Sequence, residues 1–285
     1  MKIVSSVSEM KNLSLTFQRA GRRIALVPTM GALHEGHLSL LKTAKRRCDT
    51  AVMSIFVNPT QFGPREDFAN YPRPFEEDCA RAEKAGCDVV FAPVKEEMYP
   101  EGSATVVTVE QLSDQLCGAS RPGHFKGVAT VVLKFFNIVS PHTAVFGLKD
   151  ALQCILLKRM ALDLNLSVEL VFAATVRETD GLAMSSRNTY LTSAERRDAP
   201  LLFEGLQNAR ALYDAGERNA SRLRSSVMGV YGRSIAFTVE YVEIVDLVHV
   251  QPLAVLDKAG LVAVAVRTRE TDTRLIDNTI LGGTL

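Results

Sequence analysis

The sequence predicts an α/β protein with a doubly wound parallel sheet, followed by a second, smaller α+β domain. Short runs that are almost continuously apolar alternate with helix-like segments through the first part of the chain. This alternation is typical of a parallel sheet covered by helices on both faces. Polar segments directly follow three of the apolar runs, and ligands of such sheets bind at the carboxyl ends of the strands. From about Val176 the pattern changes.

The strand-like segments of the first part are short and separated by helix-like segments. Strands are predicted at Ile24–Val27, Ala51–Val57, Asp88–Phe91, Thr143–Phe146 and Ser167–Phe172. Helices are predicted at Gly36–Arg47, Phe75–Ala85, Gly127–Val139 and Ala151–Leu162. In the first helix Leu38, Leu41 and Ala44 share one face, and basic residues occupy the last turn, where they suit the helix dipole.

The last third of the chain groups its predicted elements by type. Helices are predicted at Ala194–Ala215 and Ala220–Tyr231, and strands at Phe237–Val245 and Leu261–Val266. This grouping indicates an α+β unit. We therefore expect residues 1–175 to form the first domain and residues 176–285 to form the smaller one.

Three polar segments follow predicted strands. They are Pro28–His37 after Val27, Asn58–Gln61 after Val57, and Gly147–Asp150 after Phe146. Because ligands of an open parallel sheet bind at the carboxyl ends of its strands, we expect these segments to contribute to one site.

Composition excludes several classes of protein. The chain has 285 residues, of which 47% are hydrophobic, and its formal net charge is +1. Such a charge gives no overall field for nucleic acid or an acidic membrane, so neither partner is expected. No apolar run approaches the roughly 20 residues that span a bilayer. The N-terminal segment lacks the apolar core of a secretory signal, so a cytoplasmic location is expected.

The five cysteines are Cys48, Cys79, Cys87, Cys117 and Cys154. Their number is odd and no pair has Cys-x-x-Cys spacing, which argues against both a disulfide framework and a cysteine zinc site. Reduced, mostly buried thiols are expected.

His34 and His37 lie three residues apart in the first polar segment, and the chain has only five histidines. Zinc proteases place two histidines four apart on one helix. Here Gly36 lies between the pair, and glycine is a poor residue inside a helix. No nearby cysteine or third histidine completes a ligand set, so zinc ranks below phosphate binding.

Phosphate binding suits a histidine pair that follows a strand and begins a helix. The first turn of a helix offers unpaired N–H groups and partial positive charge. Gly31 and Gly36 allow the backbone to approach a ligand closely, and two imidazoles can stabilise charge that develops on a phosphate. Neither the dinucleotide fingerprint nor the P-loop pattern is present. Histidines satisfied by local hydrogen bonds are the alternative.

The His-x-Gly-His spacing resembles the motif of the nucleotidyltransferase superfamily, whose members transfer AMP or CMP by attack at the α-phosphate. Further segments resemble, in order, the motifs of the pantothenate synthetase (pantoate–β-alanine ligase) family. These segments are Val27–His37, Ser54–Phe62, Tyr71–Arg73, Arg121–Val128, Met184–Asn188 and Arg274–Asn278. The resemblance covers nearly the whole chain.

One motif departs from the family pattern. The family usually has Phe-Gly-Glu-Lys-Asp, then an aromatic residue and Gln-Gln, whereas this chain has Phe-Gly-Leu-Lys-Asp-Ala-Leu-Gln from Phe146 to Gln153. Leu148 replaces a glutamate, and Ala151 and Leu152 replace the aromatic residue and a glutamine. Because Lys149 and Gln153 are retained, we expect an active enzyme.

The resemblance implies a Rossmann-like first domain that binds ATP and pantoate, and a C-terminal domain that closes over the active site. It also implies an ATP-dependent ligase of pantothenate and coenzyme A biosynthesis. The carboxylate of (R)-pantoate would attack the α-phosphorus of ATP, giving pantoyl adenylate and diphosphate, and the amine of β-alanine would then displace AMP. The family suggests a homodimer. Mg²⁺ is expected mainly on the ATP phosphates, and no protein residue is assigned as a metal ligand.

The resemblance also implies roles for individual residues. His34, His37 and Lys149 are the expected catalytic residues, with His37 the better transition-state donor. Gln61 and Gln153 are expected to bind pantoate, and Gln61 also β-alanine. The expected ATP-binding residues are Met30, Gly31, Ala32, Leu33, His34, Glu35, Gly36, His37, Gly147, Leu148, Lys149, Asp150, Val176, Met184, Ser185, Ser186 and Arg187.

Two pairs of residues have alternative interpretations. Glu77 and Asp78 are interpreted as a solvated helix face rather than as magnesium helpers. Arg121 and His124 are expected to close over the site, to fix a loop, or to contact a second subunit. Two alternatives remain for the function: a related nucleotidyltransferase that stops after nucleotidyl transfer, and a non-catalytic nucleotide-binding paralogue.

Overall fold

A computed structural model describes residues 1–64 and 66–285. The chain divides into two compact units. The first contains residues 1–114, 118–148 and 156–174, and the second contains residues 115–117, 149–155 and 175–285. Helix α7 (Ala151–Asp163) contributes residues to both units.

The first unit is built on a six-stranded sheet in the order β1-β4-β3-β2-β5-β6, with every pair parallel. The strands are β1 (Lys2–Val4), β2 (Ile24–Thr29), β3 (Thr50–Ile55), β4 (Val89–Phe91), β5 (Thr143–Gly147) and β6 (Glu169–Ala173). From β2 the chain proceeds outward through β3 to β4, and β5 and β6 then lie on the other side of β2. The predicted doubly wound parallel sheet is confirmed.

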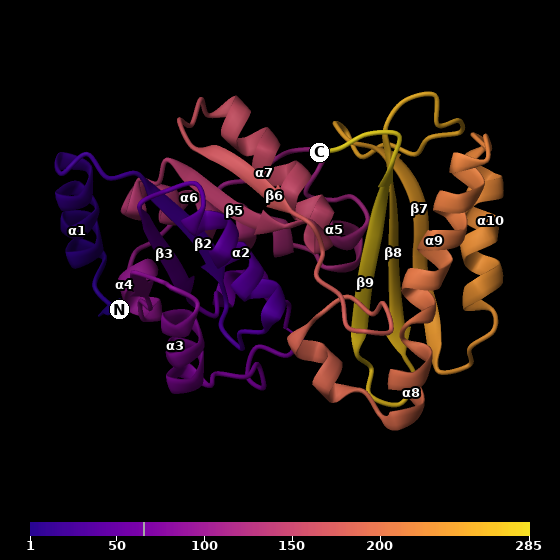
Figure 1. The fold of residues 1–285 in the computed structure, drawn as a ribbon, viewed down its shortest axis with the longest axis horizontal. Coiled ribbons are helices and arrows are strands. Elements are labelled where there is room, and N and C mark those ends of the chain that lie inside the picture. Colours follow the sequence, from indigo (N-terminus) through magenta and orange to yellow (C-terminus); the bar gives the residue numbers. More distant parts are fainter. Residues whose placement is uncertain (65) are drawn as a thin grey trace. The chain divides into compact units, whose positions relative to one another are not determined.

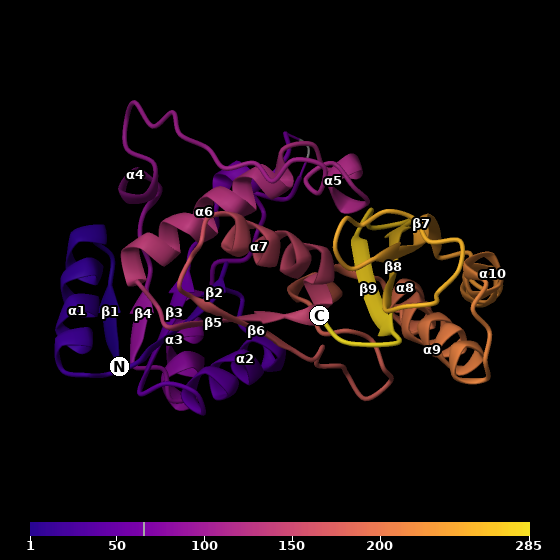
Figure 2. The same ribbon diagram turned by 90° about the horizontal axis from the view of Figure 1, so that it is seen from above.

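Helices cover both faces of this sheet. Figure 2 shows α2 (Glu35–Lys45) and α3 (Phe75–Lys84) on one face, and α6 (His124–Val139) and α7 on the other. A fully buried core lies between α2, α3 and the sheet; its members include Ala25, Val27, Leu41, Met53, Val90 and Val145. The continuous apolar character of the strands follows from this burial on both faces. The remaining helical segments of this part of the chain are α1 (Val7–Arg19), α4 (Lys95–Met98), α5 (Cys117–Ser120), η1 (Pro59–Gln61) and η2 (Leu148–Asp150).

The second unit contains a three-stranded antiparallel sheet, β7 (Phe237–Asp246), β8 (Gly260–Thr268) and β9 (Arg274–Leu281), with β8 in the centre. Helices α9 (Leu201–Asp214) and α10 (Ala220–Tyr231) lie side by side against this sheet (Figure 1). The core between them includes Leu206, Leu223, Val227, Val264 and Val266. The predicted α+β class of this region is confirmed.

The prediction of one helix over Ala194–Ala215 is wrong. The structure has two helices, α8 (Ser193–Asp198) and α9, separated at Ala199 and Pro200. Proline lacks the N–H that would continue the ladder of hydrogen bonds, and its ring clashes with the carbonyl four residues earlier. Pro200 instead occupies the N-cap of α9, where no hydrogen bond is lost.

Several elements were not predicted from the sequence. Strand β1, helix α1 and strand β9 are regular elements that the apolar pattern did not reveal. Helix α6 begins at His124, three residues before the predicted start. Strand β2 continues through Pro28 to Thr29, because Pro28 and Thr29 still pair in register with Ser54 and Ile55 of β3.

The five cysteines are buried, as predicted. No helix in residues 1–64 or 66–285 combines the length and the apolar character that crossing a bilayer requires.

Glu195 in helix α8 connects that helix to a distant turn. Its carboxylate accepts hydrogen bonds from the N–H groups of Thr192, Glu270 and Thr271, at 2.9–3.0 Å, and from the Thr271 hydroxyl. Burial alone would raise the pKa of Glu195, but the hydrogen bonds from Thr271, Thr192 and Glu270 outweigh it and lower the pKa to about 2. The ionised form is therefore the one that stabilises the fold.

Replacing Glu195 with glutamine is expected to lower the free energy of unfolding by about 1–3 kcal/mol at neutral pH, because an amide cannot accept all of these bonds. A carboxyl whose folded-state pKa is depressed stabilises the protein above its unfolded pKa of 4.5, and this contribution is lost as the pH falls toward 2. Urea unfolding of both proteins from pH 7 down to pH 3 measures the effect, and the difference should shrink toward the acid end. Glu204→Gln, which breaks an exposed pair with Arg233, is the control and should change stability by less than about 0.5 kcal/mol. Equal effects of the two substitutions would contradict the assignment.

Candidate active site

The three polar segments singled out in the sequence follow three neighbouring strands, β3, β2 and β5. Strands β2 and β5 lie at the point where the winding of the sheet reverses. Loops that leave the carboxyl ends of strands at such a point diverge and leave room for a ligand. The parallel order of strands therefore places these segments at one edge of the sheet.

The loop after β2 has an unusual backbone. Gly31 has φ +85° and Ala32 has φ +50°. A Cβ atom added at Gly31 would lie 2.8 Å from the Asp78 Oδ2 atom and 3.2 Å from Ile55. Glycine is therefore required at residue 31 both for its left-handed conformation and for lack of space.

Asp78 holds this loop in place, which corrects its interpretation as part of a solvated helix face. Its side chain lies in α3 and the residue is only 1% exposed. Its two oxygens accept hydrogen bonds from the N–H groups of Ala32, at 2.8 Å, and Leu33, at 2.7 Å. Burial raises the pKa of Asp78, and the hydrogen bonds from Leu33 and Ala32 and the charge of Arg81 offset only part of that increase. Glu77 is exposed and pairs with Arg81, as expected of a solvated face.

The two histidines cap the start of α2. His34 is the N-cap residue, and its Nδ1 atom accepts a hydrogen bond from the Gly36 N–H at 3.1 Å. The His37 Nδ1 atom accepts from the His34 N–H at 3.4 Å. The two rings lie 4.1 Å apart between centroids and are tilted by 32°. Each side chain is partly exposed.

These caps fix the tautomer of both histidines. A neutral imidazole has one acceptor nitrogen and one N–H donor. Because both Nδ1 atoms accept backbone N–H groups, both Nε2 atoms carry the proton in the neutral form. The pair therefore presents two Nε2–H donors at the N-terminus of a helix, where negative charge is favoured.

Gln61 ends the short helix η1 after strand β3. Its Oε1 atom accepts from the Asn58 amide at 3.1 Å, and its Nε2 atom lies 3.1 Å from the Met30 sulfur. Asn58 is 1% exposed, and its Oδ1 atom also accepts from the Tyr99 hydroxyl. A buried amide thus anchors the side chain of Gln61 beside the loop that carries the histidines.

Most of the remaining predicted site residues lie in the second unit, whereas Gly147 and Leu148 belong to the first. Lys149 donates from Nζ to the Met184 carbonyl oxygen at 2.8 Å, and the Lys149 carbonyl accepts from the Asn278 amide at 2.8 Å. The Met184 N–H donates to the Val176 carbonyl at 3.0 Å. Ser185 caps the short helix η3 (Ser186–Tyr190) by accepting from the Arg187 N–H. Lys149, Val176 and Met184–Arg187 are therefore brought together.

The electrostatic surroundings of Lys149 lower its pKa to about 8. Burial is the main cause, and Arg187 and Arg177 act in the same direction, while Asp150 and Asp277 oppose them. Arg177 is itself held by Asp277 through two hydrogen bonds of 2.6 and 3.0 Å. The Lys149 ammonium thus lies in an environment that favours the arrival of an anion.

Comparison with known proteins identifies the family of the chain. The family model for pantoate-beta-alanine ligase matches residues 2–280. The chain is 51% identical over 282 residues to a pantothenate synthetase from Pelotomaculum thermopropionicum, with 99% of both chains covered. The chain belongs to the pantoate–β-alanine ligase family.

Solved structures of this ligase family have the same fold. The pantothenate synthetase of Thermus thermophilus superimposes with a TM-score of 0.93 at 42% identity, covering 99% of this chain and 100% of the other. A pantoate–β-alanine ligase from Francisella tularensis, complexed with β-γ ATP and β-alanine, has a TM-score of 0.80 at 31% identity, covering 98% and 97%. The expected ligase fold and enzyme class are thus shown over nearly the whole length.

The residues that depart from the family pattern lie around the start of α7. Leu148 is partly exposed in η2, whereas Ala151 and Leu152 are buried. Gln153 is partly exposed in the first turn of α7. The two substituted residues of the helix are apolar and buried, so they pack in the interior of the protein.

Three residues support the candidate site in ways that the sequence did not reveal: Asp78 was misinterpreted, and Asp277 and Asn278 were noted only within the motif Arg274–Asn278, without a role. Asp78, Asp277 and Asn278 each support a predicted site residue or its loop. No local signal indicated their partners, which lie 46, 100 and 129 residues away. In the described parts of the chain, no group of three or more His, Cys, Asp or Glu side chains could hold a metal ion.

Replacing Asp78 with alanine is expected to lower the free energy of unfolding by about 2–4 kcal/mol, because the N–H groups of Ala32 and Leu33 lose their acceptor. The same change should lower kcat, since the loop leading to the histidines loses its anchor. Urea unfolding and steady-state kinetics measure both effects. Glu77→Ala, on the same helix, is the control and should change stability by less than about 0.5 kcal/mol. A normal kcat in a folded Asp78→Ala protein would refute the anchoring role.

Proposed function

We propose that the enzyme condenses (R)-pantoate with β-alanine in two half-reactions that consume ATP. A pantoate carboxylate oxygen attacks the α-phosphorus, the bond to the β-phosphate oxygen breaks, and diphosphate leaves. The β-alanine nitrogen then attacks the activated carbonyl carbon, the bond to AMP breaks, and the amine proton passes to water or buffer. The products are pantothenate, AMP and diphosphate.

The histidine pair is the observation that carries this proposal. In the first step an anion attacks a polyanion, so stabilisation of charge and positioning matter more than covalent chemistry. The two Nε2–H donors of His34 and His37 suit the phosphate oxygens, with His37 acting on charge that develops in the transition state. Met30–Leu33, Glu35 and Gly36 provide the backbone that surrounds the nucleotide.

The residues gathered around Lys149 are assigned to the same nucleotide. Lys149 would act on the phosphates and on the departing diphosphate, and its ammonium suits them as a compact charge. Ser185, Ser186 and Arg187 would supply hydroxyl donors and a guanidinium fork to the phosphate chain. Met184, Gly147, Leu148 and Asp150 complete the set, and Val176 would bind adenine through its backbone.

Gln61 and Gln153 are assigned to pantoate, and Gln61 also to β-alanine. A neutral amide has both donor and acceptor atoms, which suit hydroxyl and carboxylate groups. Magnesium would enter as the MgATP complex, held by phosphate oxygens rather than by a protein cluster. Both oxygens of Asp78 already accept backbone N–H groups, so Asp78 is not assigned as a ligand.

The product assay tests this function. Purified protein incubated with ATP, Mg²⁺, pantoate and β-alanine should form AMP, diphosphate and pantothenate in equal amounts. Formation of ADP, or no turnover, would refute the proposal. Pantoate alone should support exchange of labelled diphosphate into ATP. A stable nucleotidyl product without any requirement for β-alanine would identify a nucleotidyltransferase instead, and ATP binding without turnover would identify a non-catalytic paralogue.

We also propose that the enzyme is a homodimer and acts in the cytoplasm. Light scattering after size-exclusion chromatography should give twice the 31.2 kDa mass of the chain, and a monomer mass would refute the dimer. The cytoplasm supplies ATP and keeps buried thiols such as these reduced.

A further inference from the structure

The backbone of Gln61 is held by two side chains from the segment that begins α6. The Gln61 carbonyl oxygen lies 2.8 Å from the Nδ1 atom of His124, and the Nη2 atom of Arg121 donates to the same oxygen at 3.4 Å. His124 is 9% exposed. Both of these side chains therefore contact the backbone of the residue assigned to pantoate.

The protonation pattern of this contact follows from Arg121. The Nη1 atom of Arg121 lies 3.0 Å from the Nε2 atom of His124. A guanidinium can only donate hydrogen bonds, so Nε2 of His124 accepts. The proton of the neutral ring is therefore on Nδ1, from which it is donated to the Gln61 carbonyl.

Glu66 fixes the guanidinium that sets this pattern. Its two oxygens accept from Nε and Nη2 of Arg121 at 2.7 and 2.6 Å. The side chains of Arg121 and Glu66 are 17% and 25% exposed. Burial alone would raise the pKa of Glu66, but the hydrogen bonds and charge of Arg121 outweigh it and lower the pKa. A two-pronged pair of this kind restricts the orientation of the guanidinium.

Close packing of α6 against η1 makes the contact rigid. A Cβ atom added at Gly127 would lie 2.3 Å from the Thr60 carbonyl oxygen and 2.6 Å from the Gln61 nitrogen. The Gly127 carbonyl also accepts from the amide of Asn58, the same group that holds the Gln61 side chain. The Gln61 backbone thus packs against α6, and its side chain is held by Asn58, which in turn donates to a carbonyl of α6.

We propose that Glu66, Arg121 and His124 are positioning residues that orient the Gln61 amide toward the hydroxy acid substrate. This inference rests on the proposed function, because it assigns Gln61 to pantoate. It selects loop fixing from the three interpretations that the sequence left open for Arg121 and His124. A misplaced amide would weaken contacts to pantoate while leaving those to ATP unchanged, because Gln61 is assigned to the acid.

Two substitutions at residue 124 separate the hydrogen bond from the packing. His124→Leu removes the donor, whereas His124→Asn keeps an N–H group near the position of Nδ1. His124→Leu should raise the KM for pantoate about tenfold with an unchanged KM for ATP. His124→Asn should recover most of that loss. A purely structural role would not produce this selective effect and rescue.

His142→Leu is the matched control. Its Nδ1 atom accepts from the Ile24 N–H at the start of β2, which is the opposite end of that strand from the loop at Met30. It should lower stability without changing the KM for pantoate. If His124→Leu does not fold, the KM for pantoate is measured in Glu66→Gln instead, because this change weakens the ion pair that orients Arg121.

The results separate this inference from the proposed function. Wild-type enzyme that forms no pantothenate would refute the function. An active wild type in which folded His124→Leu, or failing that Glu66→Gln, leaves the KM for pantoate unchanged would refute only the positioning network. Equal increases in the KM for ATP and for pantoate would also refute it.

Discussion

Replacing His37 with alanine is expected to lower kcat for adenylate formation by about 10²–10³-fold, the usual cost of losing one preorganised donor to transition-state charge. The KM for ATP should change little, because the role proposed for the Nε2–H group is to stabilise charge that develops at the α-phosphate in the transition state. His37→Gln retains an N–H donor at a similar reach and should recover part of the rate. Rapid-quench measurement of diphosphate release with pantoate and ATP gives the rate of adenylate formation.

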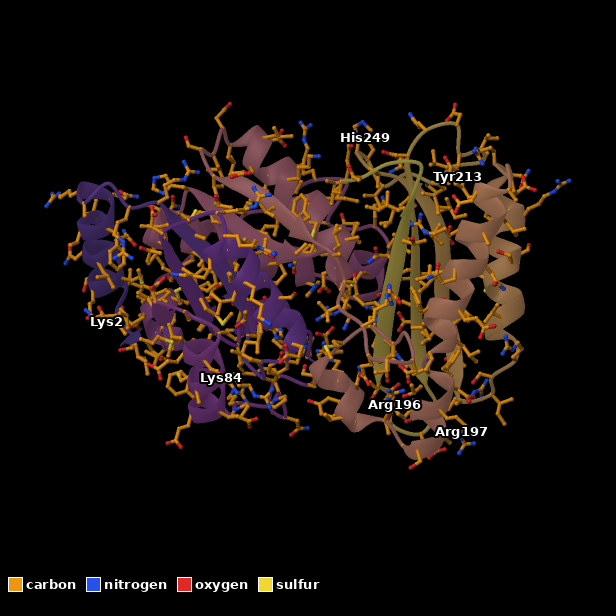
Figure 3. The ribbon with its side chains drawn as sticks, in the orientation of Figure 1. Lys2, Lys84, Arg196, Arg197, Tyr213 and His249 are labelled. Atoms are coloured by element: carbon orange, nitrogen blue, oxygen red, sulfur yellow. The ribbon has the colours of Figure 1, made fainter. Side chains whose placement is uncertain are left out.

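Two features of the structure define the controls for this experiment. His37 also accepts the His34 N–H, so thermal unfolding must show that the variant keeps its fold. His249→Ala removes an exposed histidine on the loop after β7 (Figure 3) and should leave kcat unchanged. A kcat for His37→Ala within about twofold of wild type would rule out the donor role, since a transition-state donor contributes far more.

Replacing Lys149 with methionine is expected to lower kcat/KM for ATP by at least about 10²-fold, because the positive charge proposed to act on the phosphates is lost. Methionine is unbranched and matches the aliphatic part of lysine in length and flexibility, so the change mainly removes the ammonium group. Lys158→Met makes the same substitution at an exposed residue of α7 and should have no effect. Retained kcat/KM in Lys149→Met would show that the ammonium does not serve ATP.

Lys149 also predicts a pH dependence. Its pKa in the free protein is about 8, so the ammonium is fully formed below pH 7 and is lost as the pH rises through 8. The value of kcat/KM for ATP should therefore fall above about pH 8, and that limb should be absent in Lys149→Met. Bound phosphate favours the ammonium, so the corresponding fall in kcat should occur at higher pH.

The depressed pKa has the opposite effect on stability. Between pH 8 and the ordinary lysine value of 10.5, the unfolded chain binds more protons at Lys149 than the folded protein does. This term alone makes the folded state more stable as the pH rises through that window. The free energy of unfolding of wild type and Lys149→Met should be measured at pH 7.5 and 9.5. The variant lacks the ammonium, so the difference between the two proteins isolates the contribution of Lys149.

Much of the fold could be predicted because its signals are local. The buried strands of the parallel sheet read as apolar runs, such as Ala51–Val57, because both of their faces are covered. Short or mixed elements gave weaker signals. Strand β1 has three residues with an exposed start, and the break at Pro200 lies inside an otherwise helical pattern.

The residues of the candidate site also differ in how far local sequence could predict them. The position of His34 and His37 between a strand and a helix follows from neighbours within ten residues of sequence, and the resemblance of ordered motifs supplied the remaining assignments. The roles of these residues stay predictions. Asp78 was misinterpreted because its sequence neighbours are charged and its helix is amphipathic, while its actual partners are N–H groups 45 and 46 residues earlier.

The sequence by itself determined the class of fold, the family and the chemical types at the site. Only the tertiary structure decided which side chains hold them in place: Asp78 on the loop at Ala32, His124 on the Gln61 carbonyl, and Asp277 on Arg177. Apolar periodicity and strand-to-helix junctions depend on residues that are close together in the sequence. A hydrogen bond that fixes a loop depends on the distance and direction between groups far apart in the chain, and folding alone brings them together.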